Sequence, residues 1–253
     1  MRIYLAATTA GFNGEYREQF IKNGKPKYML ETFFNGEKTC EKVLNDVGTE
    51  NFLLDSGAFS YMSGAKCSKE MLWAYAERYA DFIIKHDVKY YFELDVDTIF
   101  GIEFVEEVRN MLEKRTMRPC IPVWHKGRGV EYWKWMCDNY KYIAIGGLVF
   151  HVKKQEWHLI KKLVNYAYYK GVKVHGLGFT KTKELEDWHF WSVDSASWTK
   201  AGALGQQRYT FKDGVMEQHR VEGNGKKIAL PKLVYSNSIE WCKYQKYMDS
   251  KRW

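Results

Sequence analysis

Short apolar stretches alternate with longer amphipathic stretches along most of the chain. The apolar stretches are rich in β-branched, aromatic and leucine residues and are bounded by Gly, Asn, Asp or Pro, so they predict β-strands. We expect strands at 2–8, 51–56, 89–95, 118–125, 142–148, 172–178, 189–195 and 231–236.

The stretches between these strands place apolar residues three to four positions apart, as in helices with one buried face. In residues 69–86, for example, Leu72, Tyr79 and Ile83 share a face. Similar patterns predict helices at 102–115, 130–140, 153–171 and 238–248. Gly171 is a suitable end for the helix at 153–171, and Asn237 is a suitable N-terminal cap for the helix at 238–248.

The order of strands and helices predicts an α/β fold. Eight strands alternating with helices in 253 residues match a single (β/α)8 TIM-type barrel, so we expect one domain over residues 1–253. Residues 205–230 depart from the alternation, because Asp213 and Gly214 form a hairpin signal between alternating polar and apolar residues. We expect a β-hairpin inserted here, after strand seven. An open, doubly wound sheet is the alternative, because alternation alone does not separate the two folds.

Composition and charge narrow the class of protein. No run of about 18 apolar residues occurs, and the first residues resemble a strand rather than a signal peptide, so we expect a cytoplasmic protein without a membrane span. The five cysteines are scattered and include no C-x-x-C pair, which predicts reduced thiols and no thiolate metal site. Neither a metal nor a cofactor is predicted. The net charge of +8 favours a polyanionic partner, nucleic acid first.

Polar residues and glycines lie at the carboxyl ends of several predicted strands. Asp55, Asp95 and Asp194 each end a strand, and His125 ends another. In a barrel these ends meet at one mouth, where active sites are built. A single aspartate after a strand is typical of a turn or helix cap. Several clustered carboxylates repel one another, so their presence indicates chemistry or a cationic ligand.

Five short motifs occur in a fixed order: DSGAFS (55–60), LD (94–95), AIGGL (144–148), HGLG (175–178) and VDSASW (193–198). Together they resemble the signature of tRNA-guanine transglycosylases, particularly the archaeal type and the shorter bacterial and phage relatives that place 7-deazaguanines in DNA. The likeness covers about residues 50 to 200. It implies a barrel enzyme that exchanges guanine for a free 7-deazaguanine base such as preQ0 or preQ1, through a covalent glycosyl–enzyme intermediate.

The resemblance implies a role for each matching residue. Asp194 matches the nucleophile that attacks C1′, and Asp55 matches the general acid/base. Asp95 would hold the N1–H and amino edge of the base, while N–H groups around Gly147 and Leu148 would bind its O6. The other expected pocket residues are Ser56, Phe59, His125, Gly146, His175 and Gly176.

The chain also departs from the family. The three closely spaced cysteines and the histidine that bind zinc in the transfer-RNA enzymes have no match, and the chain ends soon after the last predicted strand. We therefore expect DNA, single- or double-stranded, as the partner. His125 stands where the family often has glutamine. The expected nucleic-acid contacts are Lys126, Arg128, Trp198 and, in the hairpin, Arg208, Lys212, Arg220, Lys226 and Lys227.

Other functions stay open at this point. The chain fits a minimal tRNA-guanine transglycosylase, or a non-catalytic barrel that binds modified bases or nucleic acid. A metal-dependent hydrolase using Asp55, Asp95 and His125 ranks last, because the early strands carry no paired histidines. Asp97 is either a second pocket carboxylate or a helix cap. The oligomeric state is open, and a monomer is compatible with the sequence.

Overall fold

The computed structural model describes residues 1–9, 12, 14–62, 64, 67–148, 152, 154–179, 181–182, 185–202, 207–220 and 230–251. The strands of the main sheet are β1 (Arg2–Leu5), β2 (Met29–Thr32), β3 (Phe52–Asp55), β4 (Tyr90–Tyr91), β5 (Val123–Trp124), β6 (Tyr142–Ile145), β7 (Lys173–Gly176) and β8 (Ser192–Ser195). The helices are α1 (Gly14–Gln19), α2 (Glu37–Val47), α3 (Ala58–Met62), α4 (Lys69–Lys85), α5 (Asp97–Phe100), α6 (Ile102–Thr116), α7 (Gly129–Asn139), α8 (Trp157–Tyr169) and α9 (Leu230–Ser250). A separate hairpin consists of β9 (Gln207–Lys212) and β10 (Val215–Arg220).

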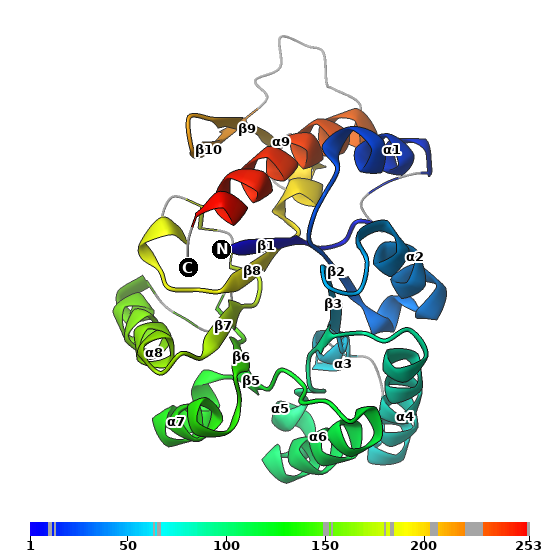
Figure 1. The fold of residues 1–253 in the computed structure, drawn as a ribbon, viewed down its shortest axis with the longest axis vertical. Coiled ribbons are helices and arrows are strands. Elements are labelled where there is room, and N and C mark those ends of the chain that lie inside the picture. The colour runs from blue at the N-terminus through cyan, green and yellow to red at the C-terminus, as the bar shows by residue number, and fades with distance from the viewer. Residues whose placement is uncertain are drawn as a thin grey trace.

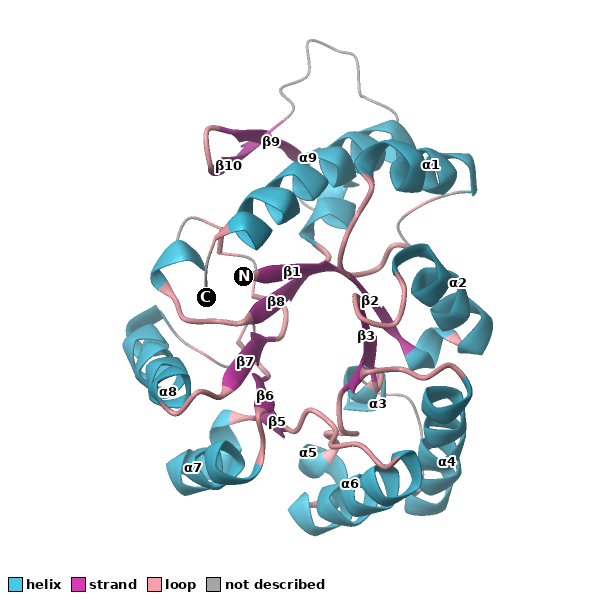
Figure 2. Ribbon diagram, in the orientation of Figure 1, coloured by secondary structure: helices cyan, strands magenta, loops and turns pink. Residues whose placement is uncertain are grey.

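Eight parallel strands form one curled sheet with helices around its outer side (Figures 1 and 2). The strand order is β4-β3-β2-β1-β8-β7-β6-β5, so each strand lies beside its neighbours in the chain and β1 pairs with β8. In the described part of the chain, the two edges meet through a parallel bridge between Phe92 and Ile121. The α/β prediction is confirmed, and the arrangement is consistent with a TIM-type barrel. The strand order does not reverse at a switch point, as it does in a doubly wound sheet.

Side chains along each strand alternate between two cores. Tyr4, Leu53, Val123 and Ala144 belong to a small cluster inside the curled sheet. Their strand neighbours, such as Ile3, Leu54 and Ile145, belong to the larger cluster between the strands and the surrounding helices. The same alternation places Asp55, two residues after Leu53, on the inner side of the sheet at the carboxyl end of β3.

The helices predicted at 69–86, 102–115, 130–140 and 153–171 are present as α4, α6, α7 and α8, with shifted ends. The Ser68 hydroxyl caps α4 by accepting a hydrogen bond from the Met71 N–H. Gly171 has a φ of +71° and follows α8 as predicted. Its left-handed backbone lets the Val172 N–H reach the Ala167 carbonyl at 2.9 Å.

The predicted strand at 231–236 is wrong, because these residues form the first turns of α9. Leu233, Val234, Trp241 and Met248 are buried at helical spacing along α9. Asn237 therefore lies inside the helix rather than capping it. The eighth strand of the sheet is instead β2, which the sequence pattern did not reveal. It forms between β1 and β3, pairing with both.

The predicted hairpin is confirmed as β9 and β10, but it follows β8, which is the eighth strand and not the seventh. Asp213 and Gly214 both have positive φ values, +51° and +83°, as a tight turn of the Asp-Gly type requires. The hairpin packs along α9: the Tyr209 N–H donates to the Asn237 side chain at 2.9 Å, and Gly214 lies against Tyr247.

Two further expectations concern the whole chain. All five cysteines are free thiols, and Cys67 is the one that is partly exposed. Among the residues that the structure describes, no helix has the length and apolar character needed to cross a membrane. The assignment of residues 1–253 to one domain stays a prediction.

Candidate active site

Three carboxylates come together at the carboxyl end of the sheet. Asp55 ends β3, Asp95 follows β4, and Asp194 lies in β8. Asp95 and Asp194 both raise the pKa of Asp55 by Coulomb repulsion, which requires each of them to lie near Asp55. The convergence predicted from the strand ends is therefore present in the fold.

Asp55 has a strongly raised pKa. Burial is the largest cause, and together with the charges of Asp95 and Asp194 it raises the pKa of Asp55 from 3.8 to about 7. The Thr32 hydroxyl and the Gly57 N–H act in the opposite direction, since both stabilise the ionised form. A carboxyl group with this pKa can both donate and accept a proton near neutral pH.

Asp194 is oriented by two donors. The Gly178 N–H donates to its Oδ1 at 2.7 Å, and Nε2 of His175 lies 3.2 Å from the same oxygen. His175 is completely buried and points into the inner cluster, where it touches the rings of Tyr4 and Phe92. The expected contact between His175 and a base does not fit this position, because Asp194 lies between the imidazole and the carboxyl end of the strand.

Asp95 and His125 form a close pair. Nε2 of His125 lies 2.6 Å from Oδ2 of Asp95, and Asp95 is 7% exposed. Burial lowers the pKa of His125, but the hydrogen bond and charge of Asp95 outweigh it and raise the pKa overall. The imidazole therefore keeps its proton to a higher pH than an isolated histidine does, and its hydrogen bond holds the Asp95 carboxylate in one orientation.

Arg128 belongs to a buried ion cluster next to this pair. Its guanidinium contacts Glu93 at 2.7 Å and Asp97 at 3.1 Å, and its side chain is 2% exposed. Arg109 contacts the other oxygen of Glu93 at 2.8 Å. The expected phosphate contact of Arg128 is wrong for this structure, because the side chain is buried and already neutralised by two carboxylates. Asp97 begins α5 and serves as a partner of Arg128.

Sequence reasoning missed Glu93 and Arg109. Glu93 is fully buried between Phe92 and Leu94, so it continues a strand whose other residues are apolar. A charged residue inside such a stretch was the available signal, since a buried carboxylate requires a charged or hydrogen-bonding partner.

The glycines at the end of β6 allow close packing at the site. A Cβ on Gly146 would lie 2.5 Å from Cε1 of His125, so the imidazole packs directly on the backbone of β6. The Gly146 N–H already donates to the Trp124 carbonyl at 2.8 Å and is not available to a base. Gly147 has a φ of +72°, and the main chain turns away from the sheet there.

The remaining predicted pocket residues differ in exposure. Ser56 is completely buried, and its hydroxyl has no hydrogen-bond partner among the described residues. Phe59 in α3 is 61% exposed. Leu148 is buried, and a Cβ on Gly176 would lie 3.0 Å from the Phe190 ring. Gly176 thus permits close packing, and its expected base contact stays a prediction, as do those of Ser56 and Phe59.

The predicted nucleic-acid contacts are spread over several elements. Trp198 is fully buried and packs on Phe12 and Phe20, so the expectation that it stacks on an extruded base is wrong for this structure. Lys126 is exposed and pairs with Glu156 at 2.5 Å. Arg208 and Lys212 are exposed on β9. Arg220 is exposed on β10, whereas Lys226 and Lys227 lie outside the described residues.

The hairpin has a definite direction relative to the site. Tyr209 contacts Asn237, while the turn at Gly214 lies beside Tyr247, ten residues further along α9. The end of α9 contacts Met1, because the terminal ammonium group donates to the Met248 carbonyl. The hairpin turn therefore lies toward the end of α9 that contacts Met1, and Arg208 lies nearer Asn237 than Lys212 does.

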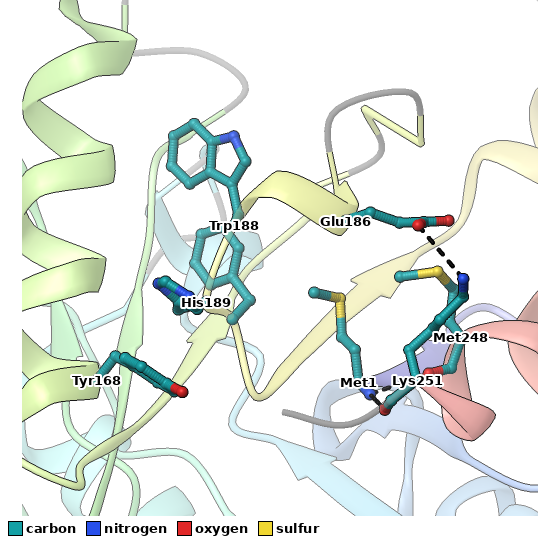
Figure 3. Close-up of a pocket in the computed structure, with 8 residues that line it drawn as sticks. Met1, Tyr168, Glu186, Trp188, His189, Met248 and Lys251 are labelled. Atoms are coloured by element: carbon teal, nitrogen blue, oxygen red, sulfur yellow. Dashed lines mark hydrogen bonds and ion pairs between the residues drawn. The ribbon is translucent and has the colours of Figure 1, made fainter.

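A pocket of about 370 Å³ lies at the opposite end of the sheet. Figure 3 shows it between Met1, Met248 and Lys251 on one side and Tyr168, Trp188 and His189 on the other. These residues precede β1, β7 and β8 or end α9, so the pocket is at the amino ends of the strands. It is separate from the three carboxylates.

Neither a metal-binding cluster nor a comparison with known proteins adds evidence about the function of this site. In the described ranges, no group of three or more His, Cys, Asp or Glu side chains is arranged to hold a metal ion. No protein-family model and no curated protein matches this chain.

Proposed function

We propose that the protein is a DNA-guanine transglycosylase of the barrel type, which exchanges guanine in DNA for a 7-deazaguanine base. The observation that carries this proposal is the meeting of Asp55, Asp95 and Asp194, with the pKa of Asp55 raised to about 7. Base exchange needs a carboxylate nucleophile and a second carboxyl group that moves a proton in both directions. The order of the motifs around these residues, which resembles the transglycosylases, supports the same reaction.

In the first step, a carboxylate oxygen of Asp194 forms a bond to C1′ as the bond from C1′ to N9 of guanine breaks. The electron pair of the broken bond goes to the guanine ring, which takes a proton from Asp55. In the second step, Asp55 takes the N9 proton of the incoming 7-deazaguanine. N9 then bonds to C1′ and releases the Asp194 carboxylate. Two displacements retain the configuration at C1′.

Other residues of the site would orient the two bases. Asp95 has one oxygen engaged by His125 at 2.6 Å, which leaves the other to accept from the N1–H and amino edge. The main-chain N–H groups of Gly147 and Leu148 would donate to O6. The Ser56 hydroxyl follows Asp55 directly and has no partner among the described residues, but it is completely buried, so its contact with the base stays a prediction.

The choice of DNA over transfer RNA rests on sequence and charge. The chain lacks the closely spaced cysteines that bind zinc in the transfer-RNA enzymes, and it carries a net charge of +8. The exposed Arg208 of the hairpin and Lys126 beyond β5 would bind phosphates.

The direct test incubates the protein with guanine-containing DNA and labelled preQ0 or preQ1, followed by mass analysis of the nucleosides. We expect incorporation from one of the two bases and a covalent protein–DNA adduct on a denaturing gel. Asp194→Asn should abolish both, because an amide is not a nucleophile of this kind. Asp187→Asn, at an exposed carboxylate, is the control with the same change of charge and should retain both.

The results also separate the alternatives. Incorporation into transfer RNA alone would favour a minimal tRNA-guanine transglycosylase. Tight binding of base or DNA without any adduct would favour a non-catalytic barrel. No incorporation from either base into single- or double-stranded DNA would contradict the proposal, and so would exchange that survives in Asp194→Asn.

A further inference from the structure

A chain of hydrogen bonds leads through the inside of the curled sheet to Asp194. The Tyr142 hydroxyl lies 2.5 Å from Oγ of Ser192, and the same oxygen lies 2.6 Å from Nδ1 of His175. Nε2 of His175 then lies 3.2 Å from Oδ1 of Asp194. The four residues come from the adjacent strands β6, β7 and β8. The chain thus joins the partly buried phenol of Tyr142, at the start of β6, to the proposed nucleophile.

The direction of each hydrogen bond follows from the groups at its ends. An ionised carboxylate only accepts, so Nε2 of His175 must carry a proton. With Nε2 protonated, a neutral imidazole has an unprotonated Nδ1, which accepts from the Ser192 hydroxyl. Ser192 has one proton to donate, so it accepts from the Tyr142 hydroxyl. Burial raises the pKa of Tyr142 well above 10, which keeps the phenol protonated as the first donor.

Two observations favour a neutral His175 over an imidazolium. The distance from Nε2 to Oδ1, 3.2 Å, is longer than the roughly 2.7–2.9 Å of a charge-assisted bond. The ring is also completely buried and packs against Tyr4 and Phe92, with ring centroids at 6.0 and 5.1 Å. By contrast, Nε2 of His125 lies only 2.6 Å from Oδ2 of Asp95.

The donors to Asp194 also distinguish its two oxygens. Among the described residues, the His175 imidazole and the Gly178 N–H both end on Oδ1. A hydrogen-bonded carboxylate oxygen is a weaker nucleophile than its partner, because the donors stabilise its negative charge. A neutral donor stabilises that charge less than an imidazolium would, so the second oxygen keeps its reactivity.

We propose that His175 is a positioning residue, held as the Nε2–H tautomer by Ser192 and Tyr142, which orients Asp194 so that Oδ2 attacks C1′. This inference rests on the proposed base exchange and adds three residues that work through the nucleophile. Ser192 sets the tautomer by its donation to Nδ1, just as the group that hydrogen-bonds the free ring nitrogen of a metal-bound histidine sets that tautomer.

The first test determines the tautomer of His175 by NMR and does not depend on enzyme activity. In protein labelled with ¹⁵N-histidine, the ring nitrogens of His175 are assigned as the signals absent from His175→Gln. We expect a proton on Nε2 and none on Nδ1 near neutral pH. A protonated Nδ1, in either the other tautomer or an imidazolium, would overturn the inference.

The second test uses two serines of the same strand. Ser192 and Ser195 are both completely buried in β8. The Ser195 hydroxyl accepts from the Ser197 N–H, and strand alternation places Ser195 on the opposite face of β8 from Ser192. Ser192→Ala should lower kcat of base exchange by about 10- to 100-fold with little change in KM, and it should change the His175 signals. Ser195→Ala should change neither.

The two proposals can fail separately. If Ser192→Ala exchanges bases at the wild-type rate, Ser192 does not set the tautomer of His175. The positioning role is then wrong, although the proposed enzyme function stands. If the wild-type protein shows the expected tautomer but never exchanges a base, the proposed function is overturned while the hydrogen-bond assignment survives.

Discussion

Replacing Asp55 by asparagine should make the folded protein more stable at alkaline pH, although it removes the proposed acid/base group. The reason is the electrostatic cost of ionising Asp55 in its half-buried position beside two other carboxylates, where desolvation is the largest cause that raises its pKa from 3.8 to about 7. At about 1.36 kcal/mol for each pKa unit, this difference corresponds to roughly 4 kcal/mol. This stability difference is an upper limit, since the asparagine amide does not reproduce every contact of the carboxyl group.

The sign follows from the protons that the two states bind. Between about pH 4 and pH 7 the unfolded chain has released the Asp55 proton while the folded protein retains it, so the stability of the folded protein falls as pH rises. Relative to alkaline pH, the protonated carboxyl contributes stability that is complete below the unfolded pKa and lost once pH has passed about 7. The advantage of Asp55→Asn should therefore grow from about 2 kcal/mol near pH 5 to about 4 kcal/mol near pH 8.5.

The assay is urea unfolding of the wild-type protein and Asp55→Asn at both pH values. Differences between the two proteins cancel the titration of groups that they share. Asp187→Asn, at an exposed position, should show no comparable dependence on pH. A stability difference that is the same at both pH values, or an asparagine variant that is less stable near pH 8.5, would refute the reasoning about Asp55.

The remaining predictions concern the base pocket and the hairpin. Gly146→Ala should weaken binding of the free 7-deazaguanine by about tenfold or more, as measured by calorimetry, because its Cβ would displace His125. Gly127→Ala, with nothing within 4 Å of the new Cβ, should bind normally; equal affinities would contradict the role of the close packing. Arg208→Ala should weaken DNA binding more than Lys212→Ala and reduce the salt dependence by about one charge. The reverse order would show that the DNA lies over the hairpin turn.

The alternation of strands and helices could be predicted because each element has its own local pattern. The hairpin was equally local, since Asp213 and Gly214 specify the turn. β2 was missed because its four residues form a strand through pairing on both sides, which is not a local property. The segment 231–236 has strand-forming residues, but the buried positions from Leu233 to Met248 follow helical spacing. The helical spacing over residues 233–248 as a whole predicts the helix that the short segment alone does not.

The site was predicted in part for the same reason. The position of Asp55 and Asp194 follows from strand alternation and the meeting of strand ends. The burial of Arg128 does not, because it depends on Glu93 and Asp97 from a different part of the chain. Trp198 likewise turns inward because Phe12 and Phe20 provide an aromatic core there.

The bridge between Phe92 and Ile121 makes one side of the sheet weaker than the rest. β4 and β5 have two residues each, so few main-chain hydrogen bonds hold the seam, and the Glu93 cluster supports it with side-chain charge. Local opening should start at this seam, and amide exchange there should be faster than at β1 and β8. Because Asp95 and His125 lie directly beyond it, such local opening would weaken their proposed contacts with a base without displacing Asp194, the proposed nucleophile, on the other side of the ring.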